Sequence, residues 1–176
     1  IYPSPITMAS SWNLDLVRQA NIETAREMRA TGSHWAFAPN VDIARDPRWG
    51  RVGETFGEDP FLVGEMGVAV IKGLQQGDFK GSEKVIANAK HFVAGGDPIN
   101  GLNFSPMDVS ERTLRQDFFP PFKKAVDAGV FTFMAAHNEV NGVPAHASDF
   151  LLDQVLRGEW GFNGFVVSDW MDVERL

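Results

Sequence analysis

The sequence predicts an α/β fold built on a parallel sheet, and three observations lead to this prediction. Four short apolar runs recur along the chain, helix-forming segments separate them, and each run is apolar along its whole length. Strands of this composition are typical of parallel sheets that are covered on both faces. Because four strand–helix units are about half of the eight in a closed (β/α)8 barrel, we expect a partial barrel of the TIM type.

The chemistry-bearing residues of the sequence follow the predicted strands. In a (β/α) barrel the loops after the strands form the active face, so we expect a site at the carboxyl ends of the strands. An open doubly wound sheet would place its site there too. However, no G-x-G-x-x-G or G-x-x-x-x-G-K-[ST] motif follows a strand, which disfavours a nucleotide-binding fold. The predicted strands are residues 35–38, 85–89, 131–134 and 165–168.

Capping and stop signals predict the helices between these strands. Asp59 followed by Pro60 indicates an N-cap and a proline at the first helical position. Ser110 is a second expected cap, and Pro120-Pro121 is expected to break or kink the helix that it begins. The predicted helices cover residues 14–29, 60–77, 110–129 and 148–157.

The composition excludes several classes of protein. A length of 176 residues suits one ordinary domain, and 44% hydrophobic with 22% charged residues is close to globular averages. The 16 Lys and Arg residues against 23 Asp and Glu give a net charge of −7 without a basic cluster. We therefore expect no nucleic-acid partner. No apolar run approaches the ~20 residues of a membrane-spanning helix, so we expect no membrane partner.

The absence of cysteine and the scatter of the histidines bear on metals and cofactors. Without cysteine there is no disulfide framework, thiolate metal site or cysteine nucleophile. The four histidines form no H-x-x-x-H or H-E-x-x-H motif. We expect neither a metal nor a cofactor.

Both ends of the sequence have the character of interior sequence. The first residues, Ile1-Tyr2-Pro3, carry neither an initiator methionine nor a signal peptide. The last residues, up to Leu176, stop inside what looks like the start of a helix. We interpret residues 1–176 as the central part of a longer barrel domain.

Asp169 is the first candidate for a functional side chain, because it directly follows the last predicted strand. A carboxylate there would emerge at the rim of the barrel, with Trp170 beside it as a flat apolar wall. The alternative is an N-cap, since turns from strand to helix often use aspartate. The position of Asp169 alone favours the N-cap interpretation.

Lys90-His91 is the second candidate, at the end of another predicted strand. Lysine is seldom buried without a partner, so Lys90 needs a carboxylate or a ligand oxygen nearby. His91 adds a donor whose protonation state can change near neutral pH. A structural ion pair and a binding site are both open interpretations.

A third candidate region runs from Asp46 to Pro60 and combines arginines, a tryptophan and several acids. It is either a structural salt-bridge network or a polar ligand site. Arginine presents a fixed fork of donors that matches hydroxyl pairs and carboxylates. We expect one of Arg48 and Arg51 to be structural and the other functional.

The segment after the third predicted strand is the last candidate region. Met134 is expected in the core, and Asn141-Gly142 predicts a turn. The position of His137 in the sequence does not by itself indicate a role for this residue. His34 and His146 have no local partner pattern, so we interpret both as structural or surface residues.

Four spaced motifs make the pattern specific. They are ARDPRWGR at 44–51, AKHF at 89–92, HNEVNG at 137–142 and GFVVSDW at 164–170, and GEWGF at 158–162 fits with them. In this order they resemble the N-terminal barrel of glycoside hydrolase family 3, above all its bacterial β-glucosidases. The resemblance covers essentially the whole chain.

The resemblance implies a retaining, exo-acting β-glycosidase that hydrolyses terminal β-D-glucosyl residues. Asp169 matches the nucleophile that forms the covalent glycosyl-enzyme. Arg51, Lys90 and His91 match residues that hydrogen-bond the sugar hydroxyls in the −1 subsite. Nearby cations would keep a nucleophilic carboxylate ionised, as this mechanism requires.

Met134 and Trp170 match residues that line that subsite, and His137 matches a position next to the nucleophile that we also expect to bind the substrate. His137 is a departure, because many members of the family carry a tyrosine there. The resemblance also implies that a sugar-binding aspartate lies upstream of Ile1 and that the acid/base glutamate lies in a following second domain. We therefore expect the isolated chain to be inactive, with a β-glucoside or oligosaccharide as the substrate of the parent protein.

The alternatives within and outside the family differ in strength. The N-acetylglucosaminidase branch carries a histidine loop soon after Lys-His, whereas Gly95-Gly96-Asp97-Pro98 lacks one, which disfavours that branch. A β-xylosidase of the same family and a non-catalytic sugar-binding fragment stay open. The resemblance favours a periplasmic or secreted parent protein, with the cytoplasm as the alternative.

Overall fold

Four parallel strands form the sheet, in the spatial order β1-β2-β3-β6. The computed structural model describes residues 2–77 and 80–176. Neighbouring strands pair in parallel register, with Trp35 opposite Ile86, Asn88 opposite Thr132 and Thr132 opposite Phe165. This is the predicted α/β architecture with about half the strands of a closed barrel. The strands are β1 Trp35–Ala36, β2 Ile86–Phe92, β3 Thr132–Ala135 and β6 Phe165–Val167.

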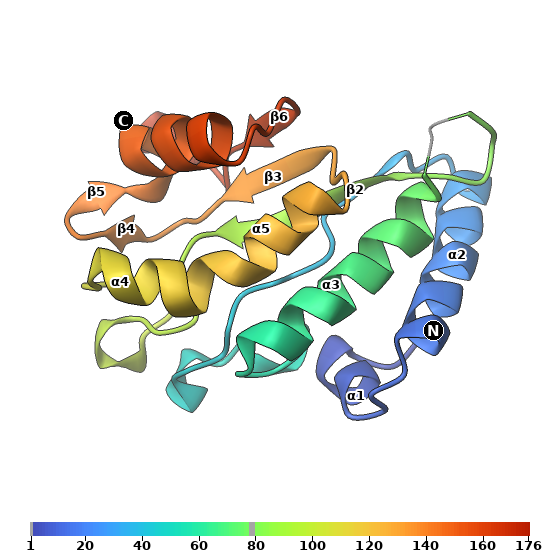
Figure 1. Ribbon diagram of the computed structural model, residues 1–176, viewed down its shortest axis with the longest axis horizontal. Helices are drawn as coiled ribbons and strands as arrows, with labels where there is room; N and C mark the ends of the chain where they lie inside the picture. The colour runs from blue at the N-terminus through green and yellow to red at the C-terminus, as the bar shows by residue number, and fades with distance from the viewer. Residues whose placement is uncertain (1, 78–79) are drawn as a thin grey trace.

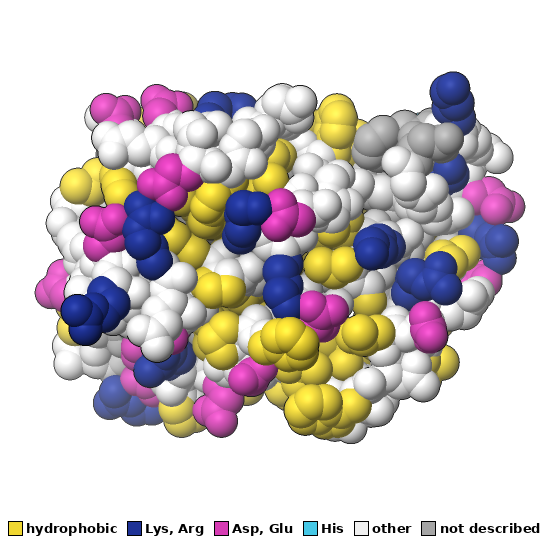
Figure 2. All heavy atoms as spheres, viewed as in Figure 1, with side chains coloured by type: hydrophobic (Ala, Val, Ile, Leu, Met, Phe, Trp, Pro, Cys, Tyr) yellow, Lys and Arg dark blue, Asp and Glu magenta, His cyan; other side chains and the backbone are white. Residues whose placement is uncertain are grey.

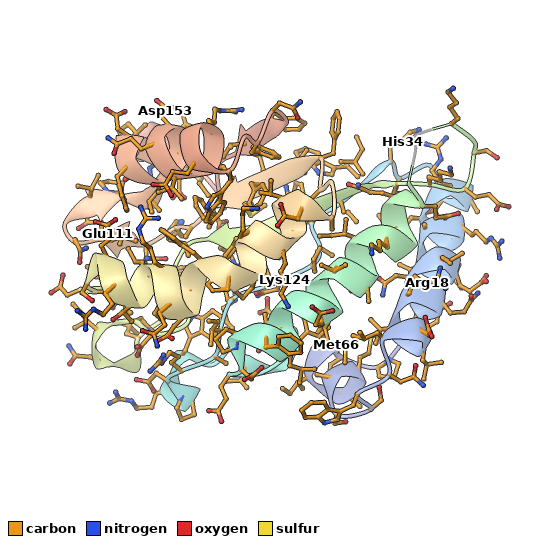
Figure 3. The ribbon with its side chains drawn as sticks, in the orientation of Figure 1. Arg18, His34, Met66, Glu111, Lys124 and Asp153 are labelled. Carbon is orange, nitrogen blue, oxygen red and sulfur yellow. The ribbon has the colours of Figure 1, made fainter. Side chains whose placement is uncertain are left out.

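The helices pack as a layer against one face of this sheet. Helices α2, α3 and the α4–α5 segment run side by side in front of the strands, and the C-terminal helix lies next to β6 (Figure 1). An ion pair between Lys124 of α5 and Glu65 of α3 links two of them (Figure 3). The α-helices are α1 Pro5–Ala9, α2 Leu14–Ala30, α3 Pro60–Gln75, α4 Glu111–Thr113 and α5 Phe119–Asp127, and the C-terminal helix is η6 Phe150–Glu159.

The predicted helix caps are present, but the predicted break in one helix takes another form. Asp59 accepts a hydrogen bond from the Leu62 N–H at 2.6 Å, and Ser110 accepts one from the Thr113 N–H at 3.2 Å. The helix that Ser110 begins continues to Asp127 through a π-helical turn, η4 Leu114–Phe118. In a π-helical turn the hydrogen bonds join residues five apart instead of four. This turn lies just before Pro120 and Pro121, which lack N–H donors.

The second predicted strand was too short, which corrects the placement of two candidate residues. Lys90 and His91 lie within β2 and not after it. The segment after β1 extends the pairing, because the Lys90 N–H donates to the Pro39 carbonyl at 3.1 Å and the Val41 N–H donates to the Lys90 carbonyl at 2.8 Å. This partner is about fifty residues away, so the local sequence did not indicate it.

The chain between β3 and β6 contains a hairpin and a second π-helical segment. Asn141 and Gly142 have φ values of 52° and 79°, as a tight hairpin turn requires, so the predicted turn is confirmed. They connect β4 Glu139–Val140 to β5 Val143–Pro144. The helix predicted at 148–157 is the π-helical η6, which ends at Glu159.

The hydrophobic core lies between the sheet and the helices. Phe133 of β3 projects toward the helices, with its ring 6.1 Å from that of Phe122 in α5 between ring centroids. It also meets Phe162 at 4.9 Å and Phe92 at 5.8 Å. Full burial of one such side chain contributes roughly 1.5–3 kcal/mol. The outer face carries interspersed acidic and basic side chains, and apolar side chains gather near α1 and the start of α3, where Trp12 and Phe61 are exposed (Figure 2).

The opposite face of the sheet corresponds to the inside of a barrel and is partly open. Trp35, Thr132 and Phe165 share this face, since Trp35 Nε1–H donates to Thr132 Oγ1 at 2.9 Å and its ring lies 5.2 Å from that of Phe165. Phe165 is 44% exposed and Phe37 is 50% exposed. A closed barrel would cover these rings with side chains from its other strands.

We expect the isolated 176-residue chain to self-associate, because the apolar inner face and the edge strands β1 and β6 are open. Unpaired strand edges are templates for pairing with another chain. Size-exclusion chromatography with light scattering measures this directly. A monodisperse monomer over a range of concentrations would contradict the prediction.

Candidate active site

Six of the seven candidate site residues line one open cleft of about 730 Å³. The cleft lies at the carboxyl ends of the strands, where β2, β3 and β6 each contribute a residue or the loop that follows. The six residues are Arg51, Lys90, His91, Met134, Asp169 and Trp170. The seventh, His137, lines a small cavity that also touches Arg51, His91 and Asp169.

Arg51 reaches the cleft from the short 3-10 turns after β1. Its guanidinium forms a bidentate pair with Glu54, with Nε–Oε1 at 3.0 Å and Nη2–Oε2 at 2.9 Å, and it stacks over Trp49. The hydrogen bond from Arg51 lowers the pKa of Glu54, and Glu54 in turn raises the pKa of Arg51. Both groups are therefore charged at neutral pH.

The other arginine of this region has a local partner. Arg48 forms an ion pair with Asp46 in its own loop, with Nη2–Oδ2 at 2.6 Å, and its side chain is 70% exposed. The hydrogen bond from Arg48 lowers the pKa of Asp46. Arg48 pairs within its own loop, whereas Arg51 faces the cleft.

His91 is held from behind by a buried aspartate. Its Nδ1 lies 2.8 Å from Asp42 Oδ2, and its backbone N–H donates to the same oxygen at 3.3 Å. With Nδ1–H donating to Asp42, the other ring nitrogen faces the cleft. That Nε2 atom lies 3.8 Å from Asp169 Oδ2 and 3.2 Å from Arg51 Nη2.

Sequence reasoning missed Asp42. A signal was present, because Asp42 is a single acid between Val41 and Ile43, and a buried carboxylate needs a partner. Asn103 and Phe104, which also line the cleft, were missed as well. They come from the irregular segment after β2, which carries no motif.

Asp169 extends from the end of β6 into the cleft. Its Oδ1 accepts a hydrogen bond from the Trp170 N–H at 2.6 Å, and its Oδ2 is the oxygen nearest to His91. The next 3-10 turn, η7 Asp172–Arg175, begins after Met171, so Asp169 does not cap it. The N-cap interpretation of this residue was therefore wrong.

Two cations lie within electrostatic reach of the Asp169 carboxylate. The negative charge of Asp169 acts to raise the pKa of both Arg51 and Lys90. For Lys90 this is outweighed by burial and by the Arg51 cation, which together lower the pKa of its ammonium group. The arrangement supplies positive charge and hydrogen-bond donors around one carboxylate.

Apolar side chains form the walls of the cleft. Met134 is buried in β3 and lines the floor, so it is a core residue and a cleft residue at once. Trp170 is 81% exposed at the rim. A cleft with a flat aromatic rim and charged donors suits a ligand with apolar faces and many hydroxyl groups.

The remaining histidines have separate environments. His137 Nδ1 lies 2.7 Å from Asp172 Oδ1, and its ring packs on Phe104 with centroids 4.4 Å apart. His146 is buried near the same aspartate, whereas His34 is exposed and contacts the Gly32 carbonyl.

Within residues 2–77 and 80–176, no group of three or more histidine and carboxylate side chains could hold a metal ion. In the same described residues, no helix has the length and apolarity to cross a membrane.

A half-barrel with a charged cleft at the carboxyl ends of its strands defines an enzyme-type barrel domain. The family model for the glycosyl hydrolase family 3 N-terminal domain matches residues 1–176. The chain belongs to this family.

Relatives of known name cover the whole chain. It is 48% identical to a beta-xylosidase of Formosa agariphila and 40% identical to a periplasmic beta-glucosidase of Salmonella typhimurium, in both cases over 100% of its length. The structure of a beta-glucosidase from Listeria innocua in complex with glucose superimposes with a TM-score of 0.96 over 98% of the chain, at 39% identity. The chain spans 25%, 23% and 24% of these three proteins, about a quarter of their length.

Proposed function

We propose that this chain is the nucleophile-bearing part of a retaining, exo-acting β-glycosidase that removes terminal β-D-glucosyl residues. The longer protein of which it would be a part is called the parent enzyme below. One observation carries the proposal: Asp169 meets His91 and Arg51 in a cleft at the carboxyl ends of the strands of a family 3 barrel. In such a barrel, conserved chemistry is built at this face.

In the proposed mechanism Asp169 attacks the anomeric carbon of the sugar. A covalent ester forms between that carbon and the carboxylate, the bond to the leaving oxygen breaks, and an acid protonates that oxygen. Water then attacks the same carbon, the ester breaks, and Asp169 is restored as a carboxylate. The deprotonated acid residue accepts the proton of that water, so the cycle is balanced.

The acid is proposed to come from the part of the parent enzyme beyond this chain. Glu54 is the other carboxylate that lines the cleft, but its pKa is lowered by the bidentate hydrogen bonds of Arg51. A general acid needs a raised pKa so that it carries a proton at working pH. Glu54 is therefore suited to hold Arg51 in place.

The remaining cleft residues are proposed to bind the sugar. Arg51 and Lys90 present N–H donors to ring hydroxyls, and His91 presents its Nε2 atom to the cleft. Those hydrogen bonds that shorten as the oxocarbenium-like state forms would accelerate the reaction. The other proposed contacts with the sugar ring are the apolar walls Met134 and Trp170, together with His137 from the adjoining small cavity.

A β-xylosidase is the second candidate activity, favoured by the 48% identity to a protein of that name. The two sugars differ by the hydroxymethyl group of glucose. The test is kcat/KM of the parent enzyme for nitrophenyl β-D-glucoside and nitrophenyl β-D-xyloside. A higher value for the glucoside supports the first proposal and a higher value for the xyloside supports the second. Binding of glucose with hydrolysis of neither substrate would instead indicate a non-catalytic sugar-binding protein.

We also propose that the parent enzyme acts in the periplasm or outside the cell. One relative supports this, which is named as a periplasmic beta-glucosidase and is 40% identical to the chain. Cell fractionation with an antibody to the chain tests the location. Recovery of the protein in the cytoplasmic fraction alone would contradict it.

We expect the activity of the parent enzyme to fall at a pH below the usual titration range of lysine, which is about 10.4. Burial and the Arg51 cation lower the pKa of Lys90, so its ammonium donors are lost earlier as the pH rises. The measurement is kcat/KM against pH for the wild type and for Lys90→Arg, whose guanidinium stays protonated. Identical alkaline limbs in the two proteins would contradict this role of Lys90.

A further inference from the structure

We infer that Asp172, His137 and His146 form a buried cluster that positions the Asp169 carboxylate, an inference that rests on the proposed function of Asp169. These three residues are called the Asp172 cluster. In this inference none of them need touch the reacting atoms. The cluster would act through the loop that carries Asp169.

The centre of the cluster is a carboxylate that is completely buried, with 0% of the Asp172 side chain exposed. Its Oδ1 lies 2.7 Å from His137 Nδ1, and its Oδ2 lies 3.6 Å from His146 Nδ1. A buried carboxylate is unfavourable unless donors or opposite charge compensate it. The His137 ring lies within hydrogen-bond distance of one of its oxygens, and the His146 ring faces the other oxygen at a longer distance.

The cluster joins three loops at the site end of the sheet. His137 follows β3, His146 lies in the 3-10 turn Ala145–Ala147 after β5, and Asp172 begins the 3-10 turn after β6. The backbone N–H of Asp172 donates to the carbonyl of Asp169 at 3.2 Å. A contact that fixes Asp172 therefore also fixes the main chain of the proposed nucleophile.

The residues between Asp169 and Asp172 have little packing of their own. Trp170 and Met171 are both exposed, and Met171 has a φ of 58°, a left-handed conformation that is unusual for a residue other than glycine. The loop is thus tethered at β6 on one side and at the buried Asp172 on the other. Without the second tether, we expect the carboxylate of Asp169 to sample several positions.

His137 links the cluster to the cleft itself. Its ring packs on Phe104, which lines the cleft, and the small cavity beside it touches both Asp169 and His91. A ring held by Asp172 therefore keeps the wall next to Asp169 closed. His146 lines neither cavity, so an effect of its substitution on catalysis would travel through Asp172.

The experiment uses the parent enzyme with Asp172→Asn, which removes the charge and keeps the shape, and with His146→Gln. The probe is an activated β-glucoside with fluorine at C2, which labels a nucleophile covalently and is released slowly. We expect Asp172→Asn to lower kcat and the labelling rate on the order of 100-fold, the scale of a misplaced reactive group. We expect His146→Gln to lower both by about tenfold, with the dissociation constant of glucose within about twofold of wild type.

Controls separate positioning from stability. His34→Gln changes an exposed histidine and should leave kcat, the labelling rate and the melting temperature unchanged. If Asp172→Asn does not fold, kcat and the labelling rate of His146→Gln test the inference instead. A lowered melting temperature with wild-type kcat and labelling rate would show that the cluster is only structural and would overturn the inference.

The two proposals fail in different ways. A wild-type parent enzyme that neither turns over glycosides nor becomes labelled would contradict the proposed function. A wild-type enzyme that does both, with an Asp172→Asn variant equal to it, would contradict the positioning role alone.

Discussion

Replacement of Asp169 by alanine is expected to remove nearly all turnover of an aryl β-glucoside by the parent enzyme while glucose still binds. Loss of a covalent nucleophile lowers kcat by several orders of magnitude in comparable cases, roughly 10⁴–10⁶-fold. The fold should survive, because the side-chain hydrogen bond that Asp169 accepts comes from the neighbouring Trp170 N–H. The measurement is kcat, together with the melting temperature and the dissociation constant of glucose.

A matched control is Asp153→Ala, since Asp153 is an exposed aspartate of η6 on the outer surface (Figure 3). It should retain wild-type kcat. If Asp169→Ala kept more than about a tenth of wild-type kcat, the loss would be under ~1.4 kcal/mol and Asp169 would not be the nucleophile. Azide adds a second check, because in the Asp169→Ala variant it can take the place of the carboxylate and form a glycosyl azide from an activated substrate.

Arg51→Ala and Lys90→Ala are expected to lower kcat/KM by about 10- to 150-fold each. Each substitution removes a charge-assisted hydrogen bond to the sugar, worth roughly 1.5–3 kcal/mol. Arg51→Ala also removes both hydrogen bonds that Arg51 donates to the Glu54 carboxylate. The measurement is kcat/KM for the better of the two nitrophenyl glycosides.

The chain offers a control for each of these substitutions. Arg48→Ala removes an exposed arginine that pairs with Asp46, and Lys123→Ala removes a lysine that pairs with Asp127 within α5. Both should leave kcat/KM within about twofold of wild type, because neither side chain lines the cleft. An unchanged kcat/KM with a lowered melting temperature in Arg51→Ala or Lys90→Ala would mean that the residue is structural.

Local signals in the sequence were enough for most of the fold. Asp59 with Pro60, and Ser110, predicted helix starts that the structure has, because a cap depends on residues within one helical turn. The extension of β2 over Lys90 and His91 was missed because it depends on pairing with a distant segment near Pro39. The π-helical turn before Pro120 was also missed, since proline signals only that the regular pattern must change.

In the candidate site, too, the residues with local sequence signals could be predicted and those that depend on distant contacts could not. Asp169 and His91 could be found because each follows or ends an apolar strand, whereas the cleft residues Asn103 and Phe104 lie in an irregular segment without a motif. Asp42 and Asp172 were missed, because the burial and the histidine partner that identify each of them depend on the fold. His146 was interpreted as structural or surface, and only the fold brings it to Asp172.

The most direct test of the central claim is to trap the covalent intermediate. The parent enzyme is incubated with the activated C2-fluoro β-glucoside, digested and analysed by mass spectrometry. The account predicts one fluoroglucosyl adduct, located on the peptide that contains Ser168-Asp169-Trp170 and assigned by fragmentation to Asp169. An adduct on another carboxylate such as Glu54, or sustained hydrolysis of the aryl β-glucoside with no adduct at all, would contradict it.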